Sequence, residues 1–277
     1  MTARLRAITA FCLTTAMPER LAHFYTGLGF TAGAPIPIPA REMELLGLAG
    51  GGIRLPLRLG AQRIDLDSFE RRGRRYPADA DAADLCFQHF ALVTDDAEAS
   101  WLRARSLGAT EISRGGPVAL PAAAGSVTAV KFRDPEGHPL ELLQFPPGAG
   151  RHGTGLLGID HTAISVADAA ASQRFYAAHG LAAGHPTRNQ GPTQAVLDGL
   201  GRVEVDVVPM LPEQARPHLE LLGYRTPRGR PAPPAAANDV AATRIIWAAD
   251  RDALLRDPDG HLHLCVGDAR RFGGHAG

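Results

Sequence analysis

Two stretches, FYTGLGFTAG at 24–33 and FYAAHGLAAG at 175–184, align without a gap at an offset of 175 − 24 = 151. A second pair, FRDPEGHPLEL at 132–142 and LRDPDGHLHLC at 255–265, aligns at an offset of 255 − 132 = 123. The second half has therefore lost 151 − 123 = 28 residues between the two landmarks. A duplication of this kind dictates the architecture, because each copy is expected to fold as the same supersecondary unit.

Each half divides again, because the segments that begin at 89 and at 161 share one plan: an alternating strand, then an amphipathic helix. An Asp precedes each helix and a Gly follows it, as expected for helix starts and stops; the pairs are Asp96 with Gly108 and Asp168 with Gly180. The segment 12–29 repeats the plan, with proline in the first helical turn, where it is tolerated. Short strands and Gly/Pro turns follow each helix, which gives three βαβββ units beginning near residues 5, 85 and 157.

A fourth unit is degenerate. Its first strand is expected within VAATRIIWAAD at 240–250, but RDALLRDPDGH follows almost at once, so its helix is missing. A Pro/Gly-rich linker at 147–156 separates the halves. We therefore predict a first domain at 1–146, made of units one and two, and a second at 157–277, made of unit three and the degenerate unit four.

With DPEGHPLELLQF at 134–145 and IDHTAISVADAAASQRFY at 159–176, the four units resemble the vicinal oxygen chelate superfamily over nearly the whole chain. This superfamily includes glyoxalases, bleomycin-resistance proteins and extradiol dioxygenases, and the Asp-Pro-Asp/Glu-Gly-His turn before an apolar strand is typical of it. The resemblance implies an α+β fold in which units pair into two incomplete, cupped β-barrels around a divalent metal. It also implies metal ligands on the first and fourth strands of each unit.

Two histidines and two glutamates match these ligand positions. Side chains alternate along a strand, so His89 and His161 share a face with small residues, while the bulkier opposite face is expected beneath the helix. Glu141 and Glu220 each lie within Leu-Glu-Leu-Leu, where a carboxylate is costly unless it is paired or bound to a metal. A lone histidine on a strand is more often a core residue, but four equivalent repeat positions favour a ligand set.

The other two units lack such a set. Unit one offers Ala10 and Asp65 at the equivalent positions, and unit four offers Thr243 and Leu264. This contrast predicts that unit two pairs with unit three in a metal-binding barrel, while units one and four form a metal-free barrel. The alternative joins one with two and three with four, as extradiol dioxygenases do.

Imidazole and carboxylate ligands suit one divalent ion, which the sequence does not distinguish among Zn, Ni, Mn, Co and Fe. The resemblance implies that Glu141 or Glu220 is the catalytic base, and an apolar barrel is expected to raise its pKa. We predict a metal-dependent isomerase, epimerase or lyase that transfers a proton next to a carbonyl of a small oxygenated substrate. Two alternatives stay open: an Fe(II) extradiol-type ring-cleaving dioxygenase, and a non-catalytic drug- or metabolite-binding protein of the bleomycin-resistance kind.

Substrate contacts are predicted from two polar segments that lie near the ligand strands. The first, at 188–194, supplies Arg188, Asn189 and Gln190, and the second follows the Glu220 strand with Tyr224 and Arg225. Ordinary turn chemistry and surface exposure are the competing explanations. His138 and His261, in the Asp-Pro-Xaa-Gly-His turns, are expected to serve the turns themselves.

Bulk properties restrict the partners. The 277 residues carry no net charge, which gives no reason to expect nucleic acid or a membrane surface as partner. The three cysteines are scattered and odd in number, which fits a reducing compartment, and no apolar run approaches a membrane span. We therefore predict a cytoplasmic protein whose partner is a small-molecule substrate.

Overall fold

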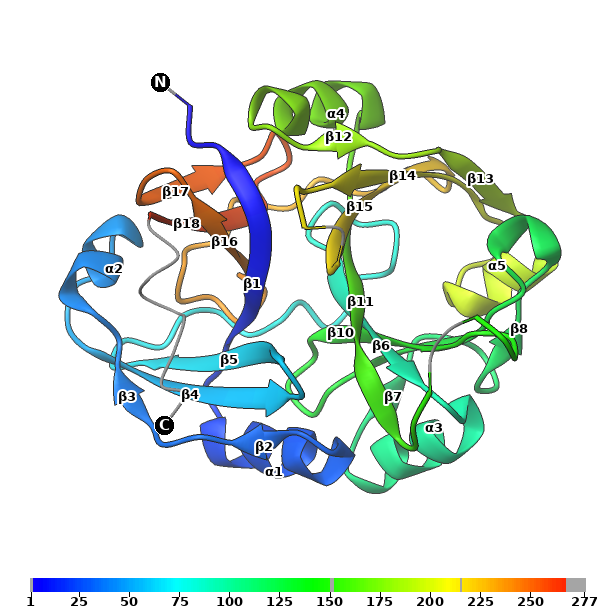
Figure 1. Ribbon diagram of the computed structural model, residues 1–277, viewed down its shortest axis with the longest axis horizontal. Helices are drawn as coiled ribbons and strands as arrows, with labels where there is room; N and C mark the ends of the chain where they lie inside the picture. Colours follow the sequence, from blue (N-terminus) through cyan, green and yellow to red (C-terminus); the bar gives the residue numbers. More distant parts are fainter. Residues whose placement is uncertain (1, 150–151, 215, 268–277) are drawn as a thin grey trace.

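The computed structural model describes residues 2–149, 152–214 and 216–267, whose strands form two strongly curled sheets (Figure 1). The first sheet combines the two ends of the described chain, in the order β17-β18-β16-β1-β5-β4-β2 with β3 also on β4. Its strands are β1 (Leu5–Thr14), β2 (Thr31–Ala32), β3 (Ile36–Pro37), β4 (Gly52–Leu59), β5 (Gln62–Phe69), β16 (Arg244–Ala249), β17 (Ala253–Arg256) and β18 (Leu262–Gly267).

The second sheet comes from the middle of the chain, in the order β12-β14-β15-β11-β6-β10-β9-β7, with β13 on β14 and β8 on β9. Its strands are β6 (Gln88–Thr94), β7 (Thr110–Glu111), β8 (Val118–Ala119), β9 (Thr128–Arg133), β10 (Pro139–Gln144), β11 (Leu156–Ser165), β12 (Ala182–Ala183), β13 (Thr187–Gln190), β14 (Glu204–Leu211) and β15 (His218–Thr226). The helices are α1 (Pro18–Leu28), α2 (Ala40–Leu45), α3 (Ala97–Ser106), α4 (Ala169–Ala178) and α5 (Pro192–Leu197), with a 3₁₀ turn η1 (Ala122–Ala124).

The sheets confirm the predicted pairing of units. Strand β1 of unit one pairs antiparallel with β16 of unit four, and β6 of unit two pairs antiparallel with β11 of unit three. The α+β class with two open barrels is likewise the one that the resemblance implies. Because neither sheet is confined to one half of the sequence, the division at 147–156 describes the order of units along the chain, and its role as a domain boundary stays a prediction.

The residues predicted to start and end the helices have those roles in the structure. Asp96 accepts a hydrogen bond from the Ala99 amide at the start of α3, and Asp168 does the same for α4. Gly108 and Gly180 follow these helices with φ of +100° and +96°, a region that favours glycine. Only residues 250–252 separate β16 from β17, so the fourth unit has no helix, as predicted.

The bulky faces of the first strands lie in one apolar core beneath the helices. Phe90 and Leu92 of β6 are buried in this core with Trp101 of α3. The ring of Phe11 from β1 stacks on Phe90, with ring centroids 5.6 Å apart, so the core also joins the two sheets. The face that carries His89 is therefore left for the concave side of its sheet.

The Asp-Pro-Xaa-Gly-His turns join units that the sheets keep apart. Asp134 accepts hydrogen bonds from the Tyr25 hydroxyl of α1 and from Nδ1 of His138, and Nε2 of His138 donates to the Thr14 carbonyl of β1 at 3.0 Å. Both partners of His138 are acceptors, so its ring must carry two protons. Burial opposes this charge, but the Asp134 carboxylate raises the pKa of His138 above its ordinary value. The second turn repeats the arrangement, since His261 contacts the Ser165 carbonyl of β11.

Replacing His138 with Ala should lower the free energy of unfolding by about 3 kcal/mol, because the buried Asp134 carboxylate and the Thr14 carbonyl lose a partner. Urea denaturation of both proteins measures this difference. Because the pKa of His138 is higher in the folded than in the unfolded state, protonated His138 stabilises the fold. This stabilisation is complete below the ordinary histidine pKa and is lost as the pH rises through the pKa of the folded state. The difference between wild type and variant should therefore shrink from pH 6 to pH 9; a constant or growing difference would contradict the charged pair.

Candidate metal centre

Strand register brings the four predicted ligands onto one concave face. In the antiparallel pair β6–β11, His89 lies opposite Ala163 and His161 lies opposite Ala91. The parallel pairs then place Glu141 of β10 beside Ala91 and Glu220 of β15 beside Ala163. In each unit, the carboxylate is thus displaced by two residues along the strand direction from the histidine on the neighbouring strand. Both side chains therefore point to the same side of the sheet.

Three of these four side chains form one tight group. Nε2 of His89 lies 3.0 Å from Oε2 of Glu141, and Nε2 of His161 lies 3.7 Å from the same oxygen. These three residues can offer ligand atoms that all lie within 4.8 Å of one another. Glu220 contacts His161 at 3.6 Å but belongs to no such group, and its side chain is 20% exposed against 7% for Glu141.

The donor set fits a divalent ion. Ligand atoms about 2.1 Å from one ion lie roughly 3.0–3.4 Å apart, close to the separations found here. Nδ1 of His161 lies 3.2 Å from Oδ2 of Asp160, which leaves Nε2 to face the group. A carboxylate behind a histidine in this way fixes the ring orientation and strengthens the histidine as a ligand.

Sequence reasoning missed three charged or titratable side chains at this centre. His218 lies two residues before Glu220, so strand alternation places both on one face, and its Nε2 is 3.2 Å from Oε1 of Glu220. Lys131 on β9 lies opposite Glu141 and forms a buried ion pair with Asp198 at 2.6 Å. Nothing in the sequence indicated Asp160, because strand alternation predicts that it points away from the face of His161. A bulge between Ile159 and His161 turns it toward the site instead.

The carboxylates at this centre stay ionised, which corrects the expectation of a raised pKa. Burial opposes ionisation of Glu141, but Lys131, His161 and His89 outweigh it and hold the pKa of Glu141 well below its usual range. The pKa of Glu220 is also lowered, by His161 and His218 against burial. Burial likewise opposes a charge on His161, yet Glu220 and the other carboxylates raise its pKa well above the ordinary value.

A cavity of about 290 Å³ opens beside the four predicted ligands. Asn189 and Tyr224, both predicted to contact substrate, line this cavity. Its walls are otherwise mostly apolar and include Leu120, Val127, Leu143, Phe145, Val205 and Leu222.

The other three predicted substrate residues do not line the cavity: Arg188, Gln190 and Arg225. They alternate with residues that do, so they point to the opposite face of the sheet. There Arg188 and Arg225 both form ion pairs with Asp206, at 2.8 Å and 2.6 Å.

The first sheet carries different side chains at the equivalent positions. Ala10 and Asp65 stand where predicted, but the register places Arg244, not Thr243, at the histidine position of unit four, since Ile246 pairs with Leu264. Arg244 is fully buried and forms an ion pair with Asp67 at 2.9 Å. Asp67 also binds Arg54, so a salt-bridge network fills this part of the barrel. Among the described residues, no metal-ligating group is found there.

The paired βαβββ units and two open barrels form a glyoxalase-like fold. Among solved structures, glyoxalase I from Zea mays matches with a TM-score of 0.57 at 15% identity, covering 96% of this chain and 92% of that chain. A candidate dioxygenase from Bacillus subtilis subsp. subtilis str. 168 matches with a TM-score of 0.54 at 15% identity, covering 96% and 86%. At such identities the likeness shows the fold and not the chemistry.

No family model matches the sequence, and no curated protein matches it. None of the helices in the described part of the chain has the length and apolar character that crossing a membrane requires.

His89→Ala and His161→Ala should each lose bound divalent metal, because each removes one of three converging donors. Asp160→Asn should weaken metal binding by about 10- to 100-fold while leaving the ligands in place. Elemental analysis after dialysis against graded chelator measures both effects. Arg188→Gln, on the opposite face of the same sheet, serves as the matched control; full metal content in both histidine variants would refute the site.

Proposed function

We propose that this protein is a metal-dependent enzyme that transfers a proton next to a carbonyl of a small oxygenated substrate, as an isomerase, epimerase or lyase. His89, Glu141 and His161 would hold the ion, with Glu220 as the catalytic base. The observation that carries the proposal is the position of Glu220. Its carboxylate lies next to a ligand histidine, outside the tight group, and is the most exposed of the four side chains.

A divalent ion bound here would polarise a substrate carbonyl and so acidify the neighbouring C–H bond. Glu220 stays ionised and accepts the proton at one carboxylate oxygen. His218 contacts Oε1 of Glu220, which holds this carboxylate in place and leaves Oε2 toward His161. Glu141 suits the ligand role instead, because Lys131 and both histidines fix its charge within the group.

The cavity restricts the substrate to a small molecule. Its apolar walls, among them Leu143 and Leu222, lower the local dielectric beside the base, which strengthens electrostatic interactions within the site. Asn189 and Tyr224 are among the polar groups that line the cavity and would orient substrate oxygens.

Glu220→Gln should keep the metal and lower kcat by about a hundredfold or more, because general-base catalysis contributes on that scale. Glu141→Gln should instead lower metal content. Measuring metal and turnover for both variants, on a panel of 2-hydroxy and 2-oxo thioesters, acids and aldehydes, separates the two roles. Loss of metal in Glu220→Gln with full metal in Glu141→Gln would reverse the assignment.

A second candidate function has support from one observation. The tight group of two histidines and one carboxylate is the ligand set of non-haem Fe(II) oxygenases. In such an enzyme, unit one is expected to pair with unit two and unit three with unit four. Here units two and three pair instead, and the two histidines and the carboxylate meet within their barrel. Oxygen consumption with catechols by the iron-loaded protein would favour this function, and turnover with Zn or Ni in the absence of oxygen would favour proton transfer. A protein that binds these compounds without turnover under either condition would be the non-catalytic alternative.

A further inference from the structure

Two separate apolar clusters form the walls of the cavity at the metal centre. Leu222 and Tyr224, which follow Glu220 along β15, belong to one cluster and form the Glu220 side of the cavity. Leu143 and Phe145, which follow Glu141 along the chain, belong to the other and form the Glu141 side together with Leu120. Because each pair stands two and four residues beyond its glutamate, the repeat gives the cavity two equivalent sides.

The two sides differ in how much apolar surface they leave open. On the Glu220 side, Leu222 and Tyr224 are only 5% and 8% exposed, so little of their surface remains for a ligand. On the Glu141 side, Leu120 and Phe145 are partly exposed, and both line the cavity. The open apolar surface of the cavity therefore lies on the Glu141 side.

A charged substrate group would find no free partner in this cavity. Among the described residues that line it, Lys131 is the sole lysine or arginine, and its ammonium group is bound to Asp198 at 2.6 Å. Gln194 donates a hydrogen bond to the other oxygen of this carboxylate at 2.9 Å, so the ion pair is fixed in place. The remaining acidic residues of the lining offer an anion no attraction. A substrate group that lies away from the metal-binding residues is therefore expected to be neutral.

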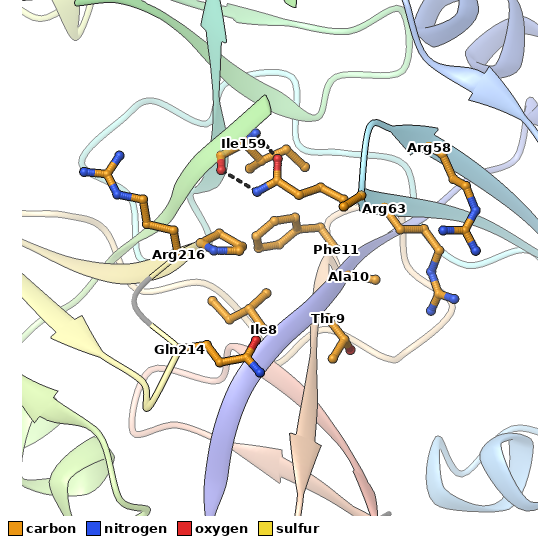
Figure 2. A pocket seen from close by; sticks show the side chains of 12 residues that line it. Ile8, Thr9, Ala10, Phe11, Arg58, Arg63, Ile159, Gln214 and Arg216 are labelled. Atoms are coloured by element: carbon orange, nitrogen blue, oxygen red, sulfur yellow. Dashed lines mark hydrogen bonds between the residues drawn. The ribbon is translucent and has the colours of Figure 1, made fainter. Parts of the chain in front are cut away.

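The cavity between the two sheets, shown in Figure 2, offers no comparable surface. Its apolar lining includes Phe11 and Ile159, which are each 1% exposed within the core, and its Arg63 is paired with Asp65 at 3.1 Å. Gln62 donates a hydrogen bond to the Ile159 carbonyl at 2.7 Å and so joins the sheets at this place. The apolar side chains there are thus already used to hold the sheets together.

We propose that the substrate carries a neutral hydrocarbon group, alkyl or aryl, which lies against Leu120 and Phe145 while its carbonyl reaches the metal-binding residues. This inference rests on the proposed function, because it names the substrate class of the same site. Apolar surface removed from water contributes to binding in proportion to its area, so each methylene group added to a ligand should strengthen binding. A charged group in the same place should not.

Alkyl hydroxamates test the proposal, because the hydroxamate group chelates the metal while its chain extends into the cavity. Titration calorimetry measures their binding to the zinc-loaded protein. From acetohydroxamate to hexanohydroxamate, each added CH₂ group should strengthen binding by about three- to fourfold. The monohydroxamate of succinic acid, whose chain ends in a carboxylate, should bind no more tightly than acetohydroxamate.

Leu120→Gln and Phe145→Gln should each reduce this gain to about twofold per CH₂ group or less, because a polar side chain replaces part of the apolar surface. Acetohydroxamate should bind to both variants as it binds to the wild type, which shows that they are folded and hold their metal. Ile53→Gln is the matched control, since Ile53 is an apolar side chain of β4 that is 46% exposed, and it should keep the full gain. Arg58→Gln, at the cavity between the sheets, should keep it too.

Three results would overturn the proposal: equal affinity for all chain lengths, an unchanged gain in both Leu120→Gln and Phe145→Gln, or loss of the gain in Arg58→Gln. The last result would place the chain in the other cavity. A chain-length gain without turnover of any carbonyl compound would support the hydrocarbon site and contradict proton transfer alone. Failure of acetohydroxamate to bind would overturn both proposals, because they share the metal centre.

Discussion

The register between β6 and β11 is the constraint on which the metal centre depends. This antiparallel pair sets His89 opposite Ala163 and His161 opposite Ala91, so both imidazoles emerge on the concave face, with small alanines leaving room between them. The period of a strand is two, so a slip of one residue would turn both histidines into the apolar core. The bulky alternate residues, Phe90 and Leu92, oppose that slip because they bury fully beneath α3.

The same backbone geometry carries opposite chemistry in the two barrels. In one, ionised Glu141 and Glu220 surround histidines, which is an environment for a cation. In the other, Arg244 and Arg54 share Asp67 and Arg54 also pairs with Glu42, so the barrel's own charges neutralise each other. Buried charges are tolerable only when each has a partner, and the duplicated register supplies partners in both cases. Units one and four thus hold buried ion pairs where units two and three hold the candidate ligands.

Much of this arrangement could be predicted from the sequence, because repeats report equivalent positions. The offset between the halves located the four units, and the contrast between His/Glu positions and Ala10/Leu264 indicated which units pair. What escaped prediction depended on register and bulges. Thr243 and Arg244 are adjacent, and only the pairing of Ile246 with Leu264 decides between them. Arg188 and Arg225 lie beside cavity residues in sequence, yet alternation turns them away.

Each unit contacts two different neighbours, so the barrel of units one and four is linked to the barrel that carries the candidate metal centre. Sheet hydrogen bonds join unit one to four and two to three, whereas the buried turns join one to two and three to four through His138 with Thr14 and His261 with Ser165. The strand order and the turns thus close a ring of four contacts. Strand β11 is thus bound to the fourth unit through the Ser165 carbonyl, which gives that unit a structural role even without its helix.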